Sequence, residues 1–264
     1  MKKVFFFLFL IISSFLFGQN IETKLISKFP LKADRFIGID EFKSVYYITN
    51  NVLFKKNKAQ TVSYNNANLG ELTSVDILNP FKLNLFYKEF NSIQILDNNL
   101  NELTDKINFT IETLFNNVLF ISQSSENNIW LYADDNKLHL FNFQNRSEKI
   151  QTQPITFYQD YFEPVNLKST YKNVWIISKT GAIQFNEYGN FIQIIDIKNI
   201  DYFFPVRKSF IYIKDNSLFY YTDKRSIKIE IDYLEKIENI YINSSSINIY
   251  DGEYVYQFEL LVSL

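Results

Sequence analysis

Short apolar runs along this chain come in pairs, and a polar turn separates the two members of each pair. In the first pair, residues 44–48 and 52–54 flank Asn50-Asn51. The runs are rich in β-branched and aromatic residues, which favour strands. Asparagine, aspartate and glycine tolerate the positive φ that tight hairpins need. The pattern therefore predicts a β-hairpin, and it recurs five times, around Asn91-Ser92, Asp135-Asn136, Thr180-Gly181, Asp215-Asn216 and Asp251-Gly252.

The spacing of these hairpins indicates a repeated unit. The turns begin at residues 50, 91, 135, 180, 215 and 251, so the unit repeats every 35 to 45 residues. Weaker candidate strands precede and follow the hairpins, for example at 73–78 and 191–197. Four strands in such a period are typical of one blade of a β-propeller.

Two turns carry a resemblance to known proteins. Residues 185–189 (Phe-Asn-Glu-Tyr-Gly) and 96–100 (Leu-Asp-Asn-Asn-Leu) look like the Asp/Asn-x-x-Gly turn between the third and fourth strands of many bacterial propellers, although only the first has the glycine. The chain thus resembles bacterial exported six-bladed β-propeller proteins. The resemblance implies an all-β fold of four-stranded antiparallel blades, at approximately 32–70, 71–110, 111–155, 156–198, 199–235 and 236–264.

The ends of the chain predict how such a ring closes. The sixth unit has no fourth strand of its own, and residues 21–31 precede the first unit. We expect residues 21–31 to be the outer strand of the last blade, with Leu25 and Phe29 covering it, because an open arc would leave a strand edge unpaired.

Two other architectures also use alternating strands. A small outer-membrane barrel needs strands of about 9–11 residues, whereas most runs here have 4 to 6 residues. A pair of β-sandwiches is the second alternative. The regular spacing of six hairpins favours the propeller over both.

The first eighteen residues have the layout of a secretory signal peptide. Lys2 and Lys3 precede an apolar stretch at 4–17, and Gly18 is a small residue before a polar segment. The stretch is shorter than the roughly 20 residues that span a membrane. We expect cleavage after Gly18, one domain over residues 19–264 with no transmembrane segment, and export to the periplasm, the cell surface or the medium.

Composition narrows the possible chemistry. The chain has 27 basic and 29 acidic residues, no cysteine and one histidine. Its balanced charge gives no reason to expect nucleic acid. The inventory excludes disulfides and thiol nucleophiles, and the single histidine argues against most zinc sites. No phosphate-loop, nucleophile-elbow or zinc-protease motif occurs, and we predict no catalytic residue, metal site or cofactor.

Several conspicuous residues have a structural interpretation. Trp130 and Trp175 hold equivalent places in two repeats and are expected to pack between blades. We expect His139 to be an ordinary sheet residue. The acidic and amide stretch at 97–105 lacks the spacing of a calcium loop and predicts a solvated hairpin. Asp40 and Asp76 are carboxylates that a calcium-dependent propeller enzyme could recruit, although their spacing does not single them out.

These features favour an exported, non-catalytic interaction or scaffold module whose partners are other proteins, such as envelope or outer-membrane proteins. An accessory role in outer-membrane assembly or secretion is the nearest analogy. A calcium-dependent lactonase-like or hydrolase-like enzyme, and a carbohydrate or small-ligand binder at the central funnel, are the alternatives.

Overall fold

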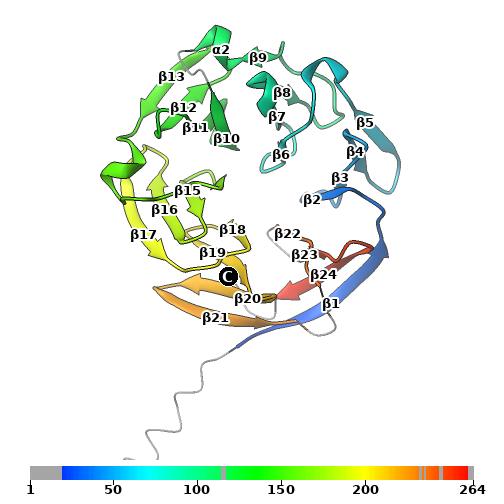
Figure 1. Cartoon of the computed structure of the whole chain (residues 1–264). Helices are drawn as coiled ribbons and strands as arrows, with labels where there is room; N and C mark the ends of the chain where they lie inside the picture. The colour runs from blue at the N-terminus through cyan, green and yellow to red at the C-terminus, as the bar shows by residue number, and fades with distance from the viewer. Residues whose placement is uncertain (1–19, 114–116, 232–233, 235, 244–245, 261–264) are drawn as a thin grey trace, which may run out of the picture.

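The computed structural model of the protein describes residues 20–113, 117–231, 234, 236–243 and 246–260. The expected signal peptide at 1–18 lies outside the described residues. Within them, the hairpins are built into four separate four-stranded antiparallel sheets and one eight-stranded sheet. Figure 1 shows the sheets arranged in a ring, and the first strand of each sequence unit faces the centre.

Each four-stranded sheet follows the order of the chain. The first contains β2 (Arg35–Ile39), β3 (Val45–Thr49), β4 (Val52–Lys56) and β5 (Thr61–Tyr64). The second contains β6 (Ser74–Asp76), β7 (Leu83–Tyr87), β8 (Ser92–Leu96) and β9 (Ile107–Asn108). The third contains β10 (Val118–Gln123), β11 (Asn128–Ala133), β12 (Leu138–Asn142) and β13 (Ser147–Gln151). The fourth contains β14 (Asn166–Ser169), β15 (Asn173–Ser178), β16 (Gly181–Asn186) and β17 (Phe191–Asp196).

The eight-stranded sheet joins the two ends of the chain. Its order is β18 (Tyr202–Val206), β19 (Ser209–Lys214), β20 (Ser217–Thr222), β21 (Arg225–Glu230), β1 (Ile21–Pro30), β24 (Tyr254–Leu260), β23 (Ile247–Tyr250) and β22 (Asn239–Ile242). Strand β1 pairs antiparallel with β24 through seven residue pairs, and parallel with β21 through two, Ile21 with Ile229 and Glu22 with Glu230. The expected pairing of the N-terminal segment with the last hairpin is therefore observed.

One detail of that expectation is wrong. Leu25 was expected to cover the last blade, but its side chain is 42% exposed. A bulge between Leu25 and Ser27 breaks the alternation of the strand, so the two halves of β1 present different positions to the core. Ile21 is buried instead, and Phe29 packs against the core as expected.

Two of the hairpin turns match the expectation, one is longer than expected, and one is displaced by a residue. Asn50-Asn51 and Asp215-Asn216 both have positive φ at two consecutive positions, as predicted. The second hairpin instead turns through the short helix η3 (Lys88–Phe90) and Asn91 in the left-handed region. In the fourth, Gly181 already pairs with Ser178 as the first residue of β16, so the turn lies one residue earlier. The remaining short helices are η2 (Ala67–Leu69), α2 (Phe109–Glu112) and η4 (Ile155–Phe157).

The core lies between neighbouring sheets. One buried cluster, for instance, combines Phe86 and Ile95 of the second sheet with Ile129 and Phe141 of the third. Similar clusters fill the other junctions. The middle strands β7, β8, β12, β15 and β16 are buried along almost their whole length, because neighbouring sheets cover both of their faces. Among the described residues, no helix has the length and apolarity needed to cross a membrane.

Candidate functional site

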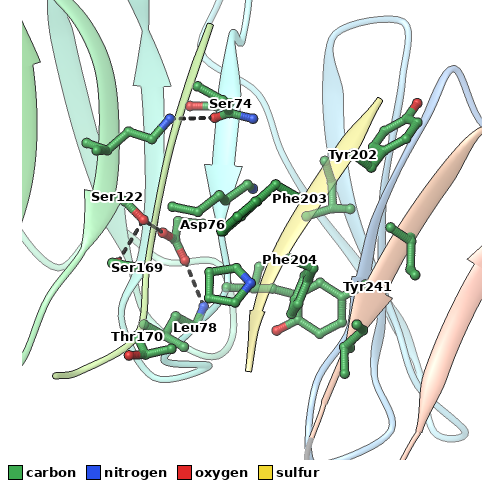
Figure 2. Close-up of a pocket in the computed structure, with 18 of the residues that line it drawn as sticks. Ser74, Asp76, Leu78, Ser122, Ser169, Thr170, Tyr202, Phe203, Phe204 and Tyr241 are labelled. Atoms are coloured by element: carbon green, nitrogen blue, oxygen red, sulfur yellow. Dashed lines mark hydrogen bonds between the residues drawn. The ribbon is translucent and has the colours of Figure 1, made fainter. Parts of the chain in front are cut away.

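The inner strands of the sheets surround a cavity of about 1420 Å³. Its lining comes from β2, β6, β10, β14, β18 and β22, so every sequence unit contributes to it. Inner strands are edge strands with one side unpaired, which suits Pro205 near the end of β18. Figure 2 shows the two sides of the cavity, one mainly polar and the other mainly aromatic.

The polar wall is held by a network around Asp76. Its Oδ1 accepts a hydrogen bond from the backbone N–H of Leu78 at 2.9 Å. Its Oδ2 accepts from the Ser122 hydroxyl at 3.1 Å and from the backbone N–H of Gln123 at 2.8 Å. Ser122 and Ser169 share a further hydrogen bond of 2.8 Å, which Figure 2 shows as a dashed line. The network therefore ties β6, β10 and β14 together.

The aromatic wall comes from β18 and β22. The rings of Phe204 and Tyr241 meet edge to face with their centroids 5.1 Å apart. Tyr241 lies against Gly38 of β2, where a Cβ atom would come within 2.4 Å of two ring carbons. Gly38 thus leaves the space that the Tyr241 ring occupies. Burial raises the pKa of Tyr241 well above its usual range, so its hydroxyl stays neutral.

Two cations belong to the polar side. The Arg35 guanidinium donates to the carbonyl oxygens of Thr73 and Leu72, each at 2.7 Å, and so links β2 to the segment before β6. Lys168 on β14 is half-buried. Burial lowers the pKa of Lys168, with the nearby Asp76 charge acting in the opposite direction and Arg35 adding to the lowering. Within the part of the chain that the structure describes, the Lys168 ammonium makes no hydrogen bond or ion pair.

Asp40 and Asp76, the two carboxylates considered from the sequence, both line the cavity. Asp40 accepts from the backbone N–H groups of Phe42 and Ser44 and from the Tyr46 hydroxyl, at 2.8 to 2.9 Å. The hydrogen bonds of both carboxylates therefore organise the strand ends. In the described residues, no group of three or more acidic, histidine or cysteine side chains is placed to hold a metal ion.

The two tryptophans lie where they were expected. Trp130 is buried among side chains of the third and fourth sheets, and Trp175 among those of the fourth and fifth sequence units. Neither lines the cavity.

His139 has more partners than its sequence context indicated. Its Nδ1 lies 2.7 Å from Glu148 Oε1, and its Nε2 lies 3.0 Å from Asp135 Oδ1. Glu148 is on the neighbouring strand β13 and Asp135 is in the preceding turn, so only the folded hairpin brings these carboxylates to the ring. His139 lies away from the cavity lining.

The oxygen-rich stretch at 97–105 forms a turn, as expected. Asp97 Oδ1 accepts from the backbone N–H groups of Asn99 and Asn101. Burial would raise the pKa of Asp97, but the hydrogen bonds from Asn101 and Asn99 outweigh it and the pKa is lowered. These oxygens are used within the turn.

The residues that distinguish the cavity, Lys168, Phe204 and Tyr241, were missed by sequence reasoning. They lie on β14, β18 and β22, which are weak strands beside the conspicuous hairpins. The one feature of the sequence that could have indicated the site is Lys168 within a candidate strand. It points to a binding site only once that strand is known to face the cavity.

Comparison with known proteins identifies the class of fold. No protein-family model matches the sequence, and no curated protein matches it. A catalytically inactive virginiamycin B lyase from Staphylococcus aureus, solved with quinupristin, has a TM-score of 0.59 and 11% identity over 90% of this chain and 100% of its own. A chain of the crystal structure of BBS1N in complex with ARL6DN has a TM-score of 0.58 and 11% identity over 85% of this chain and 77% of its own.

A third structure, the Pan2 WD40 domain of Neurospora crassa, has a TM-score of 0.57 and 9% identity over 88% of this chain and 76% of its own. The resemblance to β-propeller proteins is thereby confirmed. At such low identity the likenesses establish the fold alone.

Proposed function

We propose that this protein is an exported, non-catalytic protein-interaction module built on a closed six-bladed ring. The blade count follows from treating the eight-stranded sheet as two blades. Only two residue pairs join β21 to β1, whereas seven join β1 to β24. Strands β18–β21 then form the fifth blade, and β22, β23, β24 and β1 form the sixth. The basic start and apolar stretch at 1–18 support export.

The observation that carries the interaction role is an exposed aromatic pair. Phe42 and Phe81 are 57% and 55% exposed, and their ring centroids lie 5.4 Å apart. They come from the β2–β3 and β6–β7 loops of adjacent sheets, and their neighbours Glu41 and Pro80 line the cavity. Each ring limits the movement of the other, so the pair presents a preorganised apolar contact at the cavity rim. Aromatic side chains of this kind are enriched in protein interfaces.

A third aromatic residue extends this surface. Tyr171, in the β14–β15 loop, is exposed, and its hydroxyl donates to the carbonyl of Leu78 at 3.2 Å. Phe42, Phe81 and Tyr171, which we call the rim aromatics, thus gather around the β6–β7 loop. We propose that a protein partner from the cell envelope docks on them. That BBS1N was solved with ARL6DN is consistent with the capacity of this fold for protein partners.

The test is capture of a partner from envelope extract, followed by binding of that purified partner to variants. F42S/F81S is expected to weaken binding about tenfold or more, because buried interface aromatics dominate affinity. The matched control is F157S. Phe157 is also an exposed phenylalanine, at 73%, but it lies in the segment before inner strand β14, whereas Phe42 and Phe81 lie in loops that follow inner strands. Equal binding by wild type, F42S/F81S and F157S would contradict the proposal.

The enzyme alternative is favoured by the lyase fold and by Asp40 and Asp76 in the cavity wall. A structural calcium ion would raise the melting temperature in calcium relative to chelator, because a ligand that binds only the folded state stabilises it. An unchanged melting temperature favours the interaction role over a calcium-dependent enzyme.

A further inference from the structure

Lys168 differs from the other buried or half-buried charged residues of the cavity in its hydrogen bonding. Asp40 and Asp76 accept hydrogen bonds from backbone and hydroxyl donors, and Arg35 donates to two carbonyl oxygens. Lys168 has no such partner among the described residues. The other charged lining residues are exposed and can be solvated, namely Glu41, Lys88, Lys172, Asp201, Arg207, Lys208 and Glu259.

Lys168 and the charged groups around it carry a net positive charge, which favours binding of an anion. Asp76 and Arg35 are the charged groups that act on its pKa, one of each sign. Together with Lys168 they give two positive charges against one negative. An anionic group beside Lys168 would balance this wall and replace part of the hydration that the ammonium loses on burial.

The opposite wall suits a different part of a ligand. Phe204 and Tyr241 present ring surfaces across the cavity, and Figure 2 shows them on the side facing Asp76, Ser122 and Ser169. The cavity, at about 1420 Å³, is larger than the roughly 300–1,000 Å³ of many small-molecule sites, so a ligand that contacts both walls must be extended.

We propose that the central cavity binds an amphipathic organic carboxylate, with its carboxylate on Lys168 and its apolar ring on Phe204 and Tyr241. This role is independent of the protein docking proposed for the rim aromatics. The hydrogen bonds around Asp76 fix the polar wall, and the Tyr241 ring packs against Phe204 in the space that Gly38 leaves. Both features preorganise the site before the ligand arrives.

The test is calorimetric titration of the folded protein with matched acids and amides. The probes are benzoate, 4-phenylbutyrate and 8-phenyloctanoate, each beside its neutral amide. Wild type is expected to bind at least one acid about tenfold or more tightly than its amide, since a charge-assisted hydrogen bond adds that much discrimination. K168M should bind acid and amide alike, whereas K172M, which removes an exposed cation of the same cavity, should keep the preference.

The second wall is tested by F204L, which should weaken acid and amide by the same factor and preserve their ratio. Circular dichroism and melting curves establish that each variant is folded before titration. Absence of binding by all three acids overturns the proposal, as does binding without preference for acid over amide. Retention of the preference in K168M overturns it as well, whatever the partner experiment on F42S/F81S gives.

Discussion

The two walls of the central cavity are built by different physical means. On the polar wall, Asp76, Ser122 and Ser169 connect three consecutive inner strands through hydrogen bonds. On the aromatic wall, Phe204 and Tyr241 connect β18 and β22 through ring packing. Hydrogen bonds fix the orientation of the groups that they join, whereas packing between rings depends on how well their shapes fit. The comparison shows that one ring of similar blades can hold two chemically distinct surfaces at its centre.

Removal of the closing strand is expected to have the largest effect, because both walls depend on the ring. Deletion of residues 19–31 removes the seven residue pairs between β1 and β24. It also removes the Leu31 carbonyl, which accepts from the Tyr250 hydroxyl at 3.1 Å. At about 0.5–1.5 kcal/mol net for each hydrogen bond, the loss approaches the roughly 5–15 kcal/mol stability of a typical domain.

The deleted protein should therefore aggregate or melt far below wild type in calorimetry. The control is L25S/I26S, which changes two exposed positions of the same strand and should alter stability by about 0.5 kcal/mol or less per site. An unchanged melting temperature after deletion would show that the ring does not need β1, and would remove the basis for counting six blades.

Substitution of Gly38 breaks the aromatic wall alone. In G38A the new Cβ would overlap the ring of Tyr241, with 2.4 Å to its nearest carbons. Overpacking of this kind costs about 1–3 kcal/mol. Chemical denaturation should report that loss, and a double-mutant cycle with Y241A should recover most of it. If the effects of G38A and Y241A on the free energy of unfolding are additive, the cost of G38A does not come from overlap with the Tyr241 ring.

Substitution of Asp76 breaks the polar wall alone. D76A leaves the N–H groups of Leu78 and Gln123 and the Ser122 hydroxyl without their acceptor. Unsatisfied buried donors cost about 1–3 kcal/mol. Asp201 is an exposed carboxylate of the same cavity, so D201A should change the free energy of unfolding by about 0.5 kcal/mol or less. Equal effects of the two substitutions would show that the network adds nothing to stability.

The smallest effect is expected from the Tyr241 hydroxyl, and it depends on pH. Burial raises the pKa of Tyr241 in the folded state, while an unfolded tyrosine titrates near about 10. Above that pH the unfolded state loses a proton that the folded state retains, so stability falls as pH rises. Y241F should match wild type at neutral pH and lose stability less steeply above about pH 10. Parallel curves for the two proteins would contradict the raised pKa.

Local sequence was informative wherever a turn has a specific backbone requirement. Asn50-Asn51 predicts its hairpin because both residues adopt positive φ. The turn at Asn186 has Gly189 at φ +73, and the turn at Asp97 has Leu100 at φ +64 in the corresponding place. Leucine is unusual in this region, and Leu100 is buried in a core cluster. The missing glycine therefore reflects a requirement of packing that the local pattern does not contain.

The sequence by itself determined the hairpins, their spacing and the pairing of the N-terminal segment with the last one. The hairpins and their spacing depend on period-two patterning and on turn residues, which are properties of neighbouring positions. The N-terminal pairing followed from the missing fourth strand of the last unit, which would otherwise leave a strand edge unpaired. Only the tertiary structure decided which side chains share the cavity. Lys168, Arg35 and Asp76 lie on three different sheets, and Tyr241 meets Gly38 from the far end of the chain. Their proximity results from the arrangement of the sheets around one centre (Figure 1), and no spacing along the sequence encodes it.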